Sequence, residues 1–329
     1  MCQYSSTDGF ASDWHLVHLG SRAVGGAGLV LTEAAAVEAR GRISPEDLGI
    51  WDDAQIELLA RIVHSVHARG AVAGMQLAHA GRKAGTARPW EGGQPLTDEQ
   101  GGWNPIAPSA LAFNTGYRVP RAASHEDIRV IRAAFRAAAQ RSLHAGFRWL
   151  ELHAAHGYLL HSFLSPLSNQ RQDAYGGRFD QRIRLLIEVA RDVRSVWPEE
   201  LPLAVRLSCT DWVEGGWTAD ETVELARRLQ PEGVDLIDCS SGGTSAQAKV
   251  PASPGYQVPF ARAVRQAGVP SAAVGLITEP AQAEAIIAEG HADLVLIGRA
   301  FLRDPYWVLN AAKTLGARVE VPAQYLRAF

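Results

Sequence analysis

Cysteine is scarce in this sequence, with Cys2, Cys209 and Cys239 the three examples among 329 residues. Three thiols are too few for a disulfide framework, and none are spaced as a CxxC zinc or iron–sulfur motif. No basic segment followed by an apolar one opens the chain, so no signal peptide is visible. We therefore expect a protein of the reducing cytoplasm that holds no metal.

Long apolar runs and an excess of either charge are also missing. No stretch of eighteen apolar residues occurs, so we expect no membrane span. The formal net charge of −3 gives no basic face for nucleic acid or an anionic membrane. Hydrophobic residues make up 47% and charged residues 20%, which is typical of a globular protein with a large core.

The chain instead alternates short apolar runs with longer amphipathic stretches. Continuous apolar runs favour parallel strands that are covered on both faces. The stretches between them have helical spacing, and Thr218 with Glu221 forms a capping-box pattern before one of them. The predicted strands are 28–33, 71–77, 148–153, 203–208, 234–240, 271–276 and 292–297. The predicted helices are 12–24, 52–69, 125–145, 180–196, 219–229, 256–267, 279–289 and 305–315.

Eight helices with at least seven strands indicate a (β/α)₈ TIM barrel, formed as one domain over residues 1–329. Only residues 1–4 precede the first helix, so the first strand is expected to be truncated. An open doubly wound sheet is the alternative, but no GxGxxG follows the first strand. Both folds place ligand groups at the carboxyl ends of the strands.

Two segments fall outside the repeat. Residues 80–123 form a long connection rich in glycine, proline and tryptophan, which we expect to act as a lid or pocket wall. An ordered surface excursion is the alternative. Residues 317–329 form a tail with an aromatic–arginine–aromatic end, which docks on its own barrel, reaches a neighbouring subunit or is disordered.

Two imidazoles and a phenol follow the third predicted strand. His153 and His156 would face opposite sides of an ideal strand, so they converge only if the chain bends, and Gly157 gives it that freedom. Converged histidines could donate to a developing oxyanion, with Tyr158 as a neutral acid. A structural histidine pair and two metal ligands are the alternatives.

Other strand ends carry polar groups and glycines. Gln76 suits the edge of a heterocycle, and Lys83 is a cation near the same end of the barrel, or else a solvated loop charge. Arg206 lies in an apolar strand and needs an acceptor, which is a ligand or a buried carboxylate. A phosphorylated ligand would fit the last two strand ends, at Gly275, Gly298 and Arg299.

Taken together, these residues resemble the old yellow enzyme family, in particular its thermophilic-like class of bacterial ene-reductases. The resemblance extends over nearly the whole chain and depends on many motifs in the same order. They lie at residues 1–4, 13–15, 26–28, 41–43, 76–83, 153–158, 164–166, 168–169, 171, 173–177, 206–208, 298–299 and 304–305.

The resemblance implies FMN as the cofactor, NADPH as hydride donor and a homodimer or homotetramer. It implies an activated alkene, quinone or nitro compound as substrate, protonated by Tyr158 and held by His153 and His156. It also implies that Tyr4, Lys83 and Arg327 contact the substrate, Arg327 from a neighbouring subunit, and that Cys2 tunes the flavin. The implied FMN contacts are Met1, Cys2, Ala34, Gln76, Arg206, Gly275, Gly298 and Arg299.

Family members carry a hairpin and most of the first strand before the Met1-Cys2 pair. Their absence here suggests a start codon assigned too far downstream or a trimmed chain. Two other functions stay open from the residues alone: a flavin-free phosphate-binding lyase or aldolase that uses Lys83, and a truncated barrel without catalysis.

Overall fold

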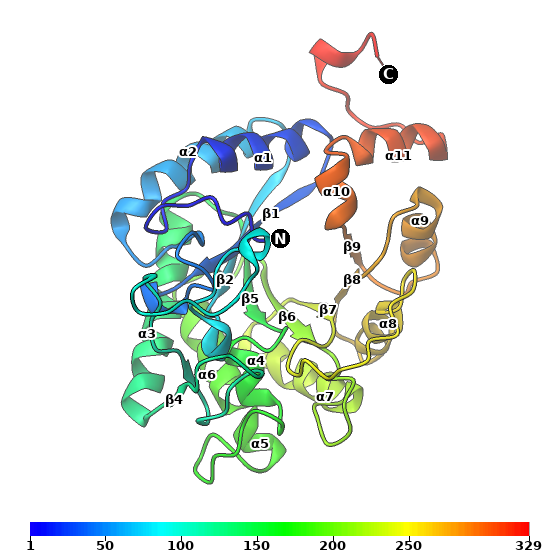
Figure 1. Cartoon of the computed structure of the whole chain (residues 1–329). Helices are drawn as coiled ribbons and strands as arrows, with labels where there is room; N and C mark the ends of the chain where they lie inside the picture. Colours follow the sequence, from blue (N-terminus) through cyan, green and yellow to red (C-terminus); the bar gives the residue numbers. More distant parts are fainter. Residues whose placement is uncertain (329) are drawn as a thin grey trace.

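The chain forms a curved parallel sheet with helices on its outer side, as the computed structural model, which describes residues 1–328, shows (Figure 1). Each strand pairs in parallel with its neighbour, in the order β1-β2-β5-β6-β7-β8-β9. The strands are β1 (Leu29–Ala36), β2 (Val72–Ala78), β5 (Trp149–Ala154), β6 (Leu203–Ser208), β7 (Leu236–Ser240), β8 (Ser271–Val274) and β9 (Leu294–Leu296).

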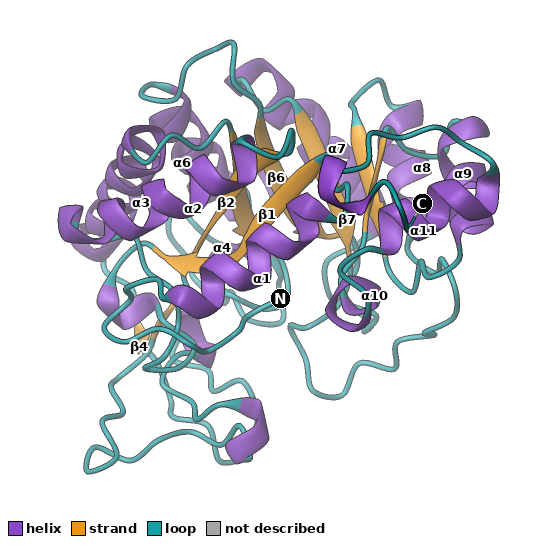
Figure 2. Ribbon diagram, turned by 90° about the horizontal axis from the view of Figure 1, so that it is seen from above, coloured by secondary structure: helices purple, strands orange, loops and turns teal. Residues whose placement is uncertain are grey.

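Amphipathic helices cover the outside of the sheet, as Figure 2 shows from above. The longer helices are α1 (Asp13–Val24), α2 (Ile56–His67), α3 (His125–His144), α6 (Arg184–Arg194), α7 (Ala219–Leu229), α8 (Val258–Gln266), α9 (Pro280–Ala288) and α11 (Trp307–Leu315). Three shorter helices are α4 (Leu159–Leu164), α5 (Phe179–Arg182) and α10 (Arg299–Arg303). Large apolar side chains, including Trp197, Trp217 and Phe135, are fully buried in this core.

The predicted barrel fold is confirmed, and every predicted strand forms within two residues of its expected start. The capping box at Thr218 is present, because its hydroxyl accepts from Glu221 N at 3.2 Å. The helix predicted over 180–196 is divided into α5 and α6, and the short helices α4 and α10 were not predicted.

The barrel is open on one side. Within residues 1–328, β1 and β9 are the two edges of the sheet and do not pair with each other. Residues 1–4 form no strand, as their short length led us to expect. The side chains of β9 are only half-buried, whereas those of β6 and β7 are almost all buried. The gap therefore exposes one flank of the barrel interior.

The 80–123 connection has little regular structure. It contains two single turns of 3₁₀ helix, η3 (Gly81–Lys83) and η4 (Pro89–Glu91), and a two-residue pairing of β3 (Ile106–Ala107) with β4 (Arg121–Ala122). It extends well beyond the helices in Figure 2. Over the described residues, none of the helices is both long and apolar enough to cross a membrane.

Candidate active site

The end of β5 turns sharply and brings three rings together. His156 and Gly157 both have positive φ, at 59° and 74°, which reverses the chain direction just after the strand. The ring centroids of His153 and His156 are 5.1 Å apart, as are those of His153 and Tyr158. The bend thus gathers side chains that a straight strand would separate.

Both histidines are neutral donors. Burial lowers the pKa of each ring well below its ordinary value, and the positive charge of Arg206 lowers it further. Ala155 N donates to His153 Nδ1 at 3.3 Å, so we assign the ring proton to Nε2. His156 Nε2 lies 2.7 Å from Ser240 Oγ, and with that hydroxyl donating, His156 Nδ1 carries the second free N–H.

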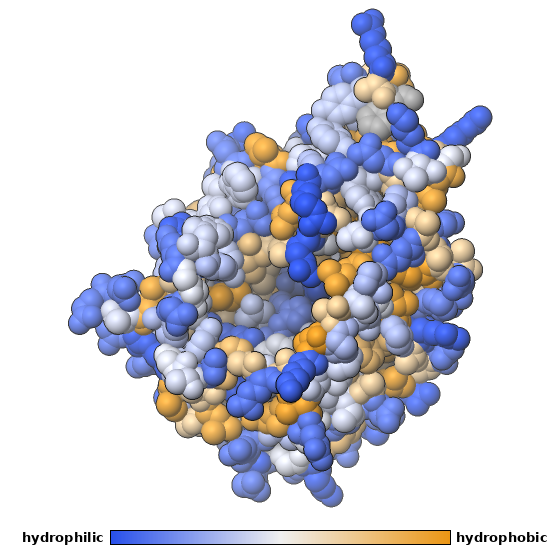
Figure 3. Space-filling model, turned by 45° about the vertical axis from the view of Figure 1, so that its right-hand side comes forward, coloured by the Kyte–Doolittle hydropathy of each residue, from blue (hydrophilic) through white to orange (hydrophobic). Residues whose placement is uncertain are grey.

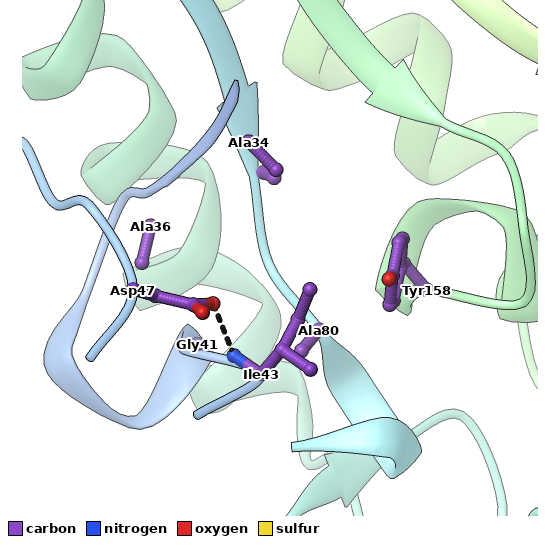
Figure 4. Close-up of a pocket in the computed structure, with 8 residues that line it drawn as sticks. Ala34, Ala36, Gly41, Ile43, Asp47, Ala80 and Tyr158 are labelled. Atoms are coloured by element: carbon purple, nitrogen blue, oxygen red, sulfur yellow. Dashed lines mark hydrogen bonds between the residues drawn. The ribbon is translucent and has the colours of Figure 1, made fainter. Parts of the chain in front are cut away.

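Tyr158 is a protonated phenol. Burial raises its pKa well above the ordinary value of 10, and the nearby Cys2, Tyr4 and Asp47 act in the same direction. Its ring lines a cavity of about 10 Å³, roughly the size of one water, across from Ala34, Ile43 and Ala80 (Figure 4). Tyr158 can therefore deliver a proton at neutral pH but does not lose it to solvent.

The N-terminal segment reaches the same cavity region. Tyr4 has a positive φ of 48°, and its ring packs edge-on against Trp90 of the 80–123 connection at 5.8 Å. Burial is the main cause that raises the pKa of both Cys2 and Tyr4, so both remain protonated. Cys2 and Tyr4 lie close enough to Tyr158 to raise the pKa of its phenol.

Lys83 lies beside the same turn. Its Nζ donates to His156 O at 2.8 Å and to Gly243 O at 2.5 Å, and it sits 4.0 Å above the Phe113 ring. Burial, with some contribution from Arg82, lowers the pKa of Lys83 to about 7. An amine held by two carbonyl oxygens is poorly placed to form a Schiff base, which argues against the lyase alternative.

A row of polar side chains crosses the barrel interior below the rings. Gln76 Nε2 donates to Glu151 Oε1 at 2.6 Å, and Gln76 pairs in register with Ala34. Arg206 Nε lies 3.1 Å from Asp238 Oδ2, so a buried carboxylate partners this arginine. The Arg206 side chain is still 21% exposed, and within residues 1–328 its Nε forms no hydrogen bond, so the guanidinium can still bind a ligand.

Removing the Arg206 charge should destabilise the fold in a pH-dependent way. Burial raises the pKa of Glu151 to about 8 and also raises that of Asp238, while Arg206 lowers both. In Arg206→Met, the folded carboxyls keep their protons to higher pH, whereas unfolded carboxyls ionise near pH 4. The folded state then binds more protons than the unfolded state, so its stability falls as pH rises.

We expect Arg206→Met to lose about 3 kcal/mol of unfolding free energy at pH 8 and clearly less at pH 5. Urea unfolding at both values, at constant FMN concentration, measures the loss. Arg228→Met, which removes an exposed helix pair with Glu224, is the control and should change little. A loss that is independent of pH would contradict the buried-charge explanation.

Backbone that could cradle a phosphate lies at the ends of β8 and β9. Gly275 has φ of 117°, and a Cβ there would lie 2.6 Å from Gln257 Nε2. Gly298 precedes α10, and a Cβ there would approach Met1 Sδ to 3.4 Å. Arg299 is exposed at the first turn of α10. A side chain at Gly275 would therefore displace Gln257, whereas a Cβ at Gly298 would lie at ordinary contact distance from Met1.

The structure does not bring Arg327 to these residues within one chain. It is exposed on the C-terminal tail, which extends away from the barrel in Figure 1. Tyr325 ties the tail to its own chain through a 3.2 Å contact between its hydroxyl and that of Tyr306. The final residue of the predicted tail, 329, lies outside the described residues.

Several residues of the site were missed by the sequence analysis. Glu151 and Asp238 complete the row around Arg206, and the period of two along a strand would have placed Glu151 on the same face as His153. Asp47 lines the cavity beside Tyr158; its carboxylate accepts from Ile43 N at 2.6 Å, and burial raises its pKa to about 8. No group of three possible metal-ligating side chains is found in residues 1–328.

The structure defines a class of protein: a parallel (β/α) barrel whose strand ends carry buried, neutral hydrogen-bond donors, as the strand ends of barrel enzymes do. Figure 3 shows a deep hollow in the middle of the face that it displays. A family model described as the NADH:flavin oxidoreductase / NADH oxidase family matches residues 1–317. The chain belongs to this family, which is the old yellow enzyme family.

Comparison with individual proteins agrees with this family assignment. An NADPH dehydrogenase of Listeria innocua is 46% identical over 332 residues, which cover 100% of this chain and 93% of that protein. A morphinone reductase in complex with tetrahydroNAD has a TM-score of 0.79 at 27% identity, covering 98% of this chain and 86% of that one. A 2-naphthoyl-CoA reductase has a TM-score of 0.85 at 27% identity over 96% of this chain, which spans 49% of that protein.

The chain is therefore a flavin-dependent oxidoreductase with FMN as cofactor and a reduced nicotinamide as electron donor. Its residues fit the cofactor on two observations. The partly exposed guanidinium of Arg206 has an Nε without a hydrogen bond, and Gly275 and Gly298 follow β8 and β9, at the strand ends where phosphate-binding barrels hold phosphate. The flavin-free lyase alternative is wrong.

Proposed function

We propose that this enzyme reduces activated carbon–carbon double bonds, of enones and related quinone or nitro electrophiles, with electrons from NADPH. The observation that carries the proposal is the cluster of His153, His156 and Tyr158, two neutral N–H donors and one neutral acid within 6.5 Å between ring centroids. Neutral donors suit an oxygen that gains negative charge during the reaction.

His153 and His156 would bind the substrate's carbonyl or nitro oxygen. As hydride reaches the β-carbon, negative charge moves to this oxygen, and the two N–H groups stabilise it. Tyr158 then gives its proton to the α-carbon, which completes the addition of H⁻ and H⁺ across the double bond. Tyr4 would add a hydrogen bond to the substrate, and Lys83 a positive charge beside the ring cluster.

FMN, when bound, accepts hydride from NADPH and passes it to the substrate. Arg206 would place its charge beside the pyrimidine end of the ring, and Ala34 and Gln76 would contact the ring system. Met1 and Cys2 would contact the same cofactor, with Cys2 adjusting its potential. The phosphate would lie against the cradle formed by Gly275, Gly298 and Arg299.

Assembly and closure belong to the same proposal. The 80–123 connection would cover the site, since it carries Lys83 and places Trp90 against Tyr4. The exposed tail would carry Arg327 into the site of a neighbouring subunit in a homodimer or homotetramer. A site completed in this way would lose affinity for substrate when the subunits separate.

A visible spectrum and two half-reactions test the proposed function. The purified protein with FMN should absorb near 450 nm (roughly, as flavins do), bleach on anaerobic NADPH, and regain its colour when cyclohexenone is added. If NADPH bleaches the flavin but cyclohexenone, a quinone and a nitroalkene all fail to restore its colour, NADPH oxidation stands and the proposed substrate class is wrong.

A further inference from the structure

The turn that carries the proposed chemistry is conformationally costly. His156 is a non-glycine residue in the left-handed region, at φ 59°, and Gly157 follows it at 74°. A left-handed conformation in a residue other than glycine is strained and persists only where its surroundings impose it. The side chains that impose it therefore also set where His156 and Tyr158 stand.

Three side chains from three elements bind the backbone of this turn. His156 N donates to Ser208 Oγ at the end of β6, at 2.9 Å. His156 O accepts from Lys83 Nζ of η3, at 2.8 Å. Gly157 N donates to His161 Nδ1 of α4, at 2.8 Å. The N and O atoms of His156 and the N atom of Gly157 thus each have a fixed side-chain partner.

His161 is the partner of Gly157, the residue that lies between His156 and Tyr158 in sequence. Its Nδ1 accepts from Gly157 N, so we assign the ring proton to Nε2. Nε2 lies 3.2 Å from Asp211 Oδ1, a close contact without the alignment of a good hydrogen bond. Thr244 Oγ1 also contacts the His161 ring, 3.0 Å from Nδ1 and 3.3 Å from Nε2.

Asp211 is itself held rigidly. Its Oδ2 accepts from Ser165 Oγ at 2.6 Å and from Trp217 N at 2.8 Å. Burial raises the pKa of Asp211, but the His161 ring and these donors outweigh it and bring the pKa to about 2. The carboxylate is therefore ionised, and it favours the tautomer of His161 that leaves Nδ1 free to accept.

We propose that His161 and Asp211 are a positioning pair for alkene reduction: they orient the Gly157 peptide and thereby fix Tyr158 relative to His156. Both side chains are fully buried behind the turn, so they do not touch the substrate. The proposal rests on the proposed roles of Tyr158 and the histidines. Packing on the far side agrees with it, because a Cβ at Gly157 would lie 2.3 Å from Gly243 O and the turn has no room to relax.

Two substitutions separate positioning from packing. His161→Leu fills the space but removes the acceptor for Gly157 N, whereas His161→Asn keeps an oxygen near the place of Nδ1. We expect His161→Leu to slow reoxidation of the reduced holoenzyme by cyclohexenone by about 10²-fold, as small misplacements of reacting groups do. We expect His161→Asn to recover most of this rate.

Two further measurements distinguish positioning from a purely structural role of His161, which would leave both of them unchanged. The solvent deuterium isotope effect on reoxidation should rise in His161→Leu, because a displaced Tyr158 makes proton transfer limiting. The affinity for cyclohexanone, which binds the donors but cannot be reduced, should fall by a smaller factor and can be titrated through the flavin absorbance. Asp211→Asn should show the same pattern in weaker form, and is the variant to use if His161→Leu does not fold.

His125→Asn is the matched control, because His125 forms an exposed pair with Asp173 at 3.2 Å, and it should behave as wild type. Equal rates in His161→Leu and His161→Asn, or an unchanged isotope effect, would overturn the positioning role. Those outcomes leave the proposed function standing if wild type still reduces cyclohexenone. If the wild type does not reduce cyclohexenone, the proposed function is wrong. The affinity of the variants for cyclohexanone then still tests whether His161 and Asp211 position the turn.

Discussion

Replacing Tyr158 by phenylalanine is expected to slow alkene reduction by about 10²–10⁴-fold, the range that a positioned general acid contributes. The centroid of the phenol ring lies 6.5 Å from that of His156, and its raised pKa keeps the phenol protonated across the physiological range. Phenylalanine preserves the ring packing against His153 at 5.1 Å but removes the proton. Bleaching by NADPH moves a hydride and needs no proton from Tyr158, so it should be nearly unchanged.

Stopped-flow measurement of the two half-reactions tests this separation. Tyr175→Phe is the matched control, since it removes a hydroxyl that donates to Glu188 at 2.9 Å on the outside of the barrel. The control should leave both half-reactions unchanged. Equal slowing of bleaching and reoxidation in Tyr158→Phe would mean that the residue shapes the site and is not the proton donor.

Alanine at His153 or His156 should raise the barrier to alkene reduction by about 2.7–4 kcal/mol, or 10²–10³ in rate, as the loss of one oxyanion donor does. The double variant should lose less than the sum of the two, because the donors act on one oxygen. The FMN content should stay nearly the same. His144→Ala, at the exposed end of α3, is the control.

The same neutral donors predict the pH dependence. Burial and the Arg206 charge keep the pKa of both rings well below 6.5, so the imidazoles stay neutral as pH falls through 6. Alkene reduction should therefore show no acid limb near pH 6.5. An inflection there that disappears in His153→Ala, or wild-type turnover of cyclohexenone by either alanine variant, would remove these histidines from the mechanism as described.

The strands were predictable because burial on both faces gives continuous apolar runs that the sequence displays directly. The short helices α4 and α10 were not, since five or six residues have too little periodicity to distinguish them from loops. Strand ends also indicated where polar side chains would gather, because parallel strands end at one edge of the barrel.

The partners of those side chains could not be predicted in the same way. Arg206 needed an acceptor, but its choice of Asp238 depends on the register between β6 and β7. The convergence of His153 and His156 depends on a left-handed histidine, a conformation that residues other than glycine seldom adopt. The neighbouring glycine indicated only that the chain was free to bend.

The strand β9 forms one edge of the gap between β1 and β9. Gly298 and Arg299, which would contact the cofactor, follow shortly after this strand. An edge strand with half-buried side chains, such as β9, is the part of a sheet that frays most readily, so its amide hydrogens exchange with solvent early. A ligand that binds only the intact form stabilises it by mass action. FMN would then stabilise the pairing of β9 in addition to its role in the reaction. Dissociation of the flavin and opening of β9 would be thermodynamically coupled.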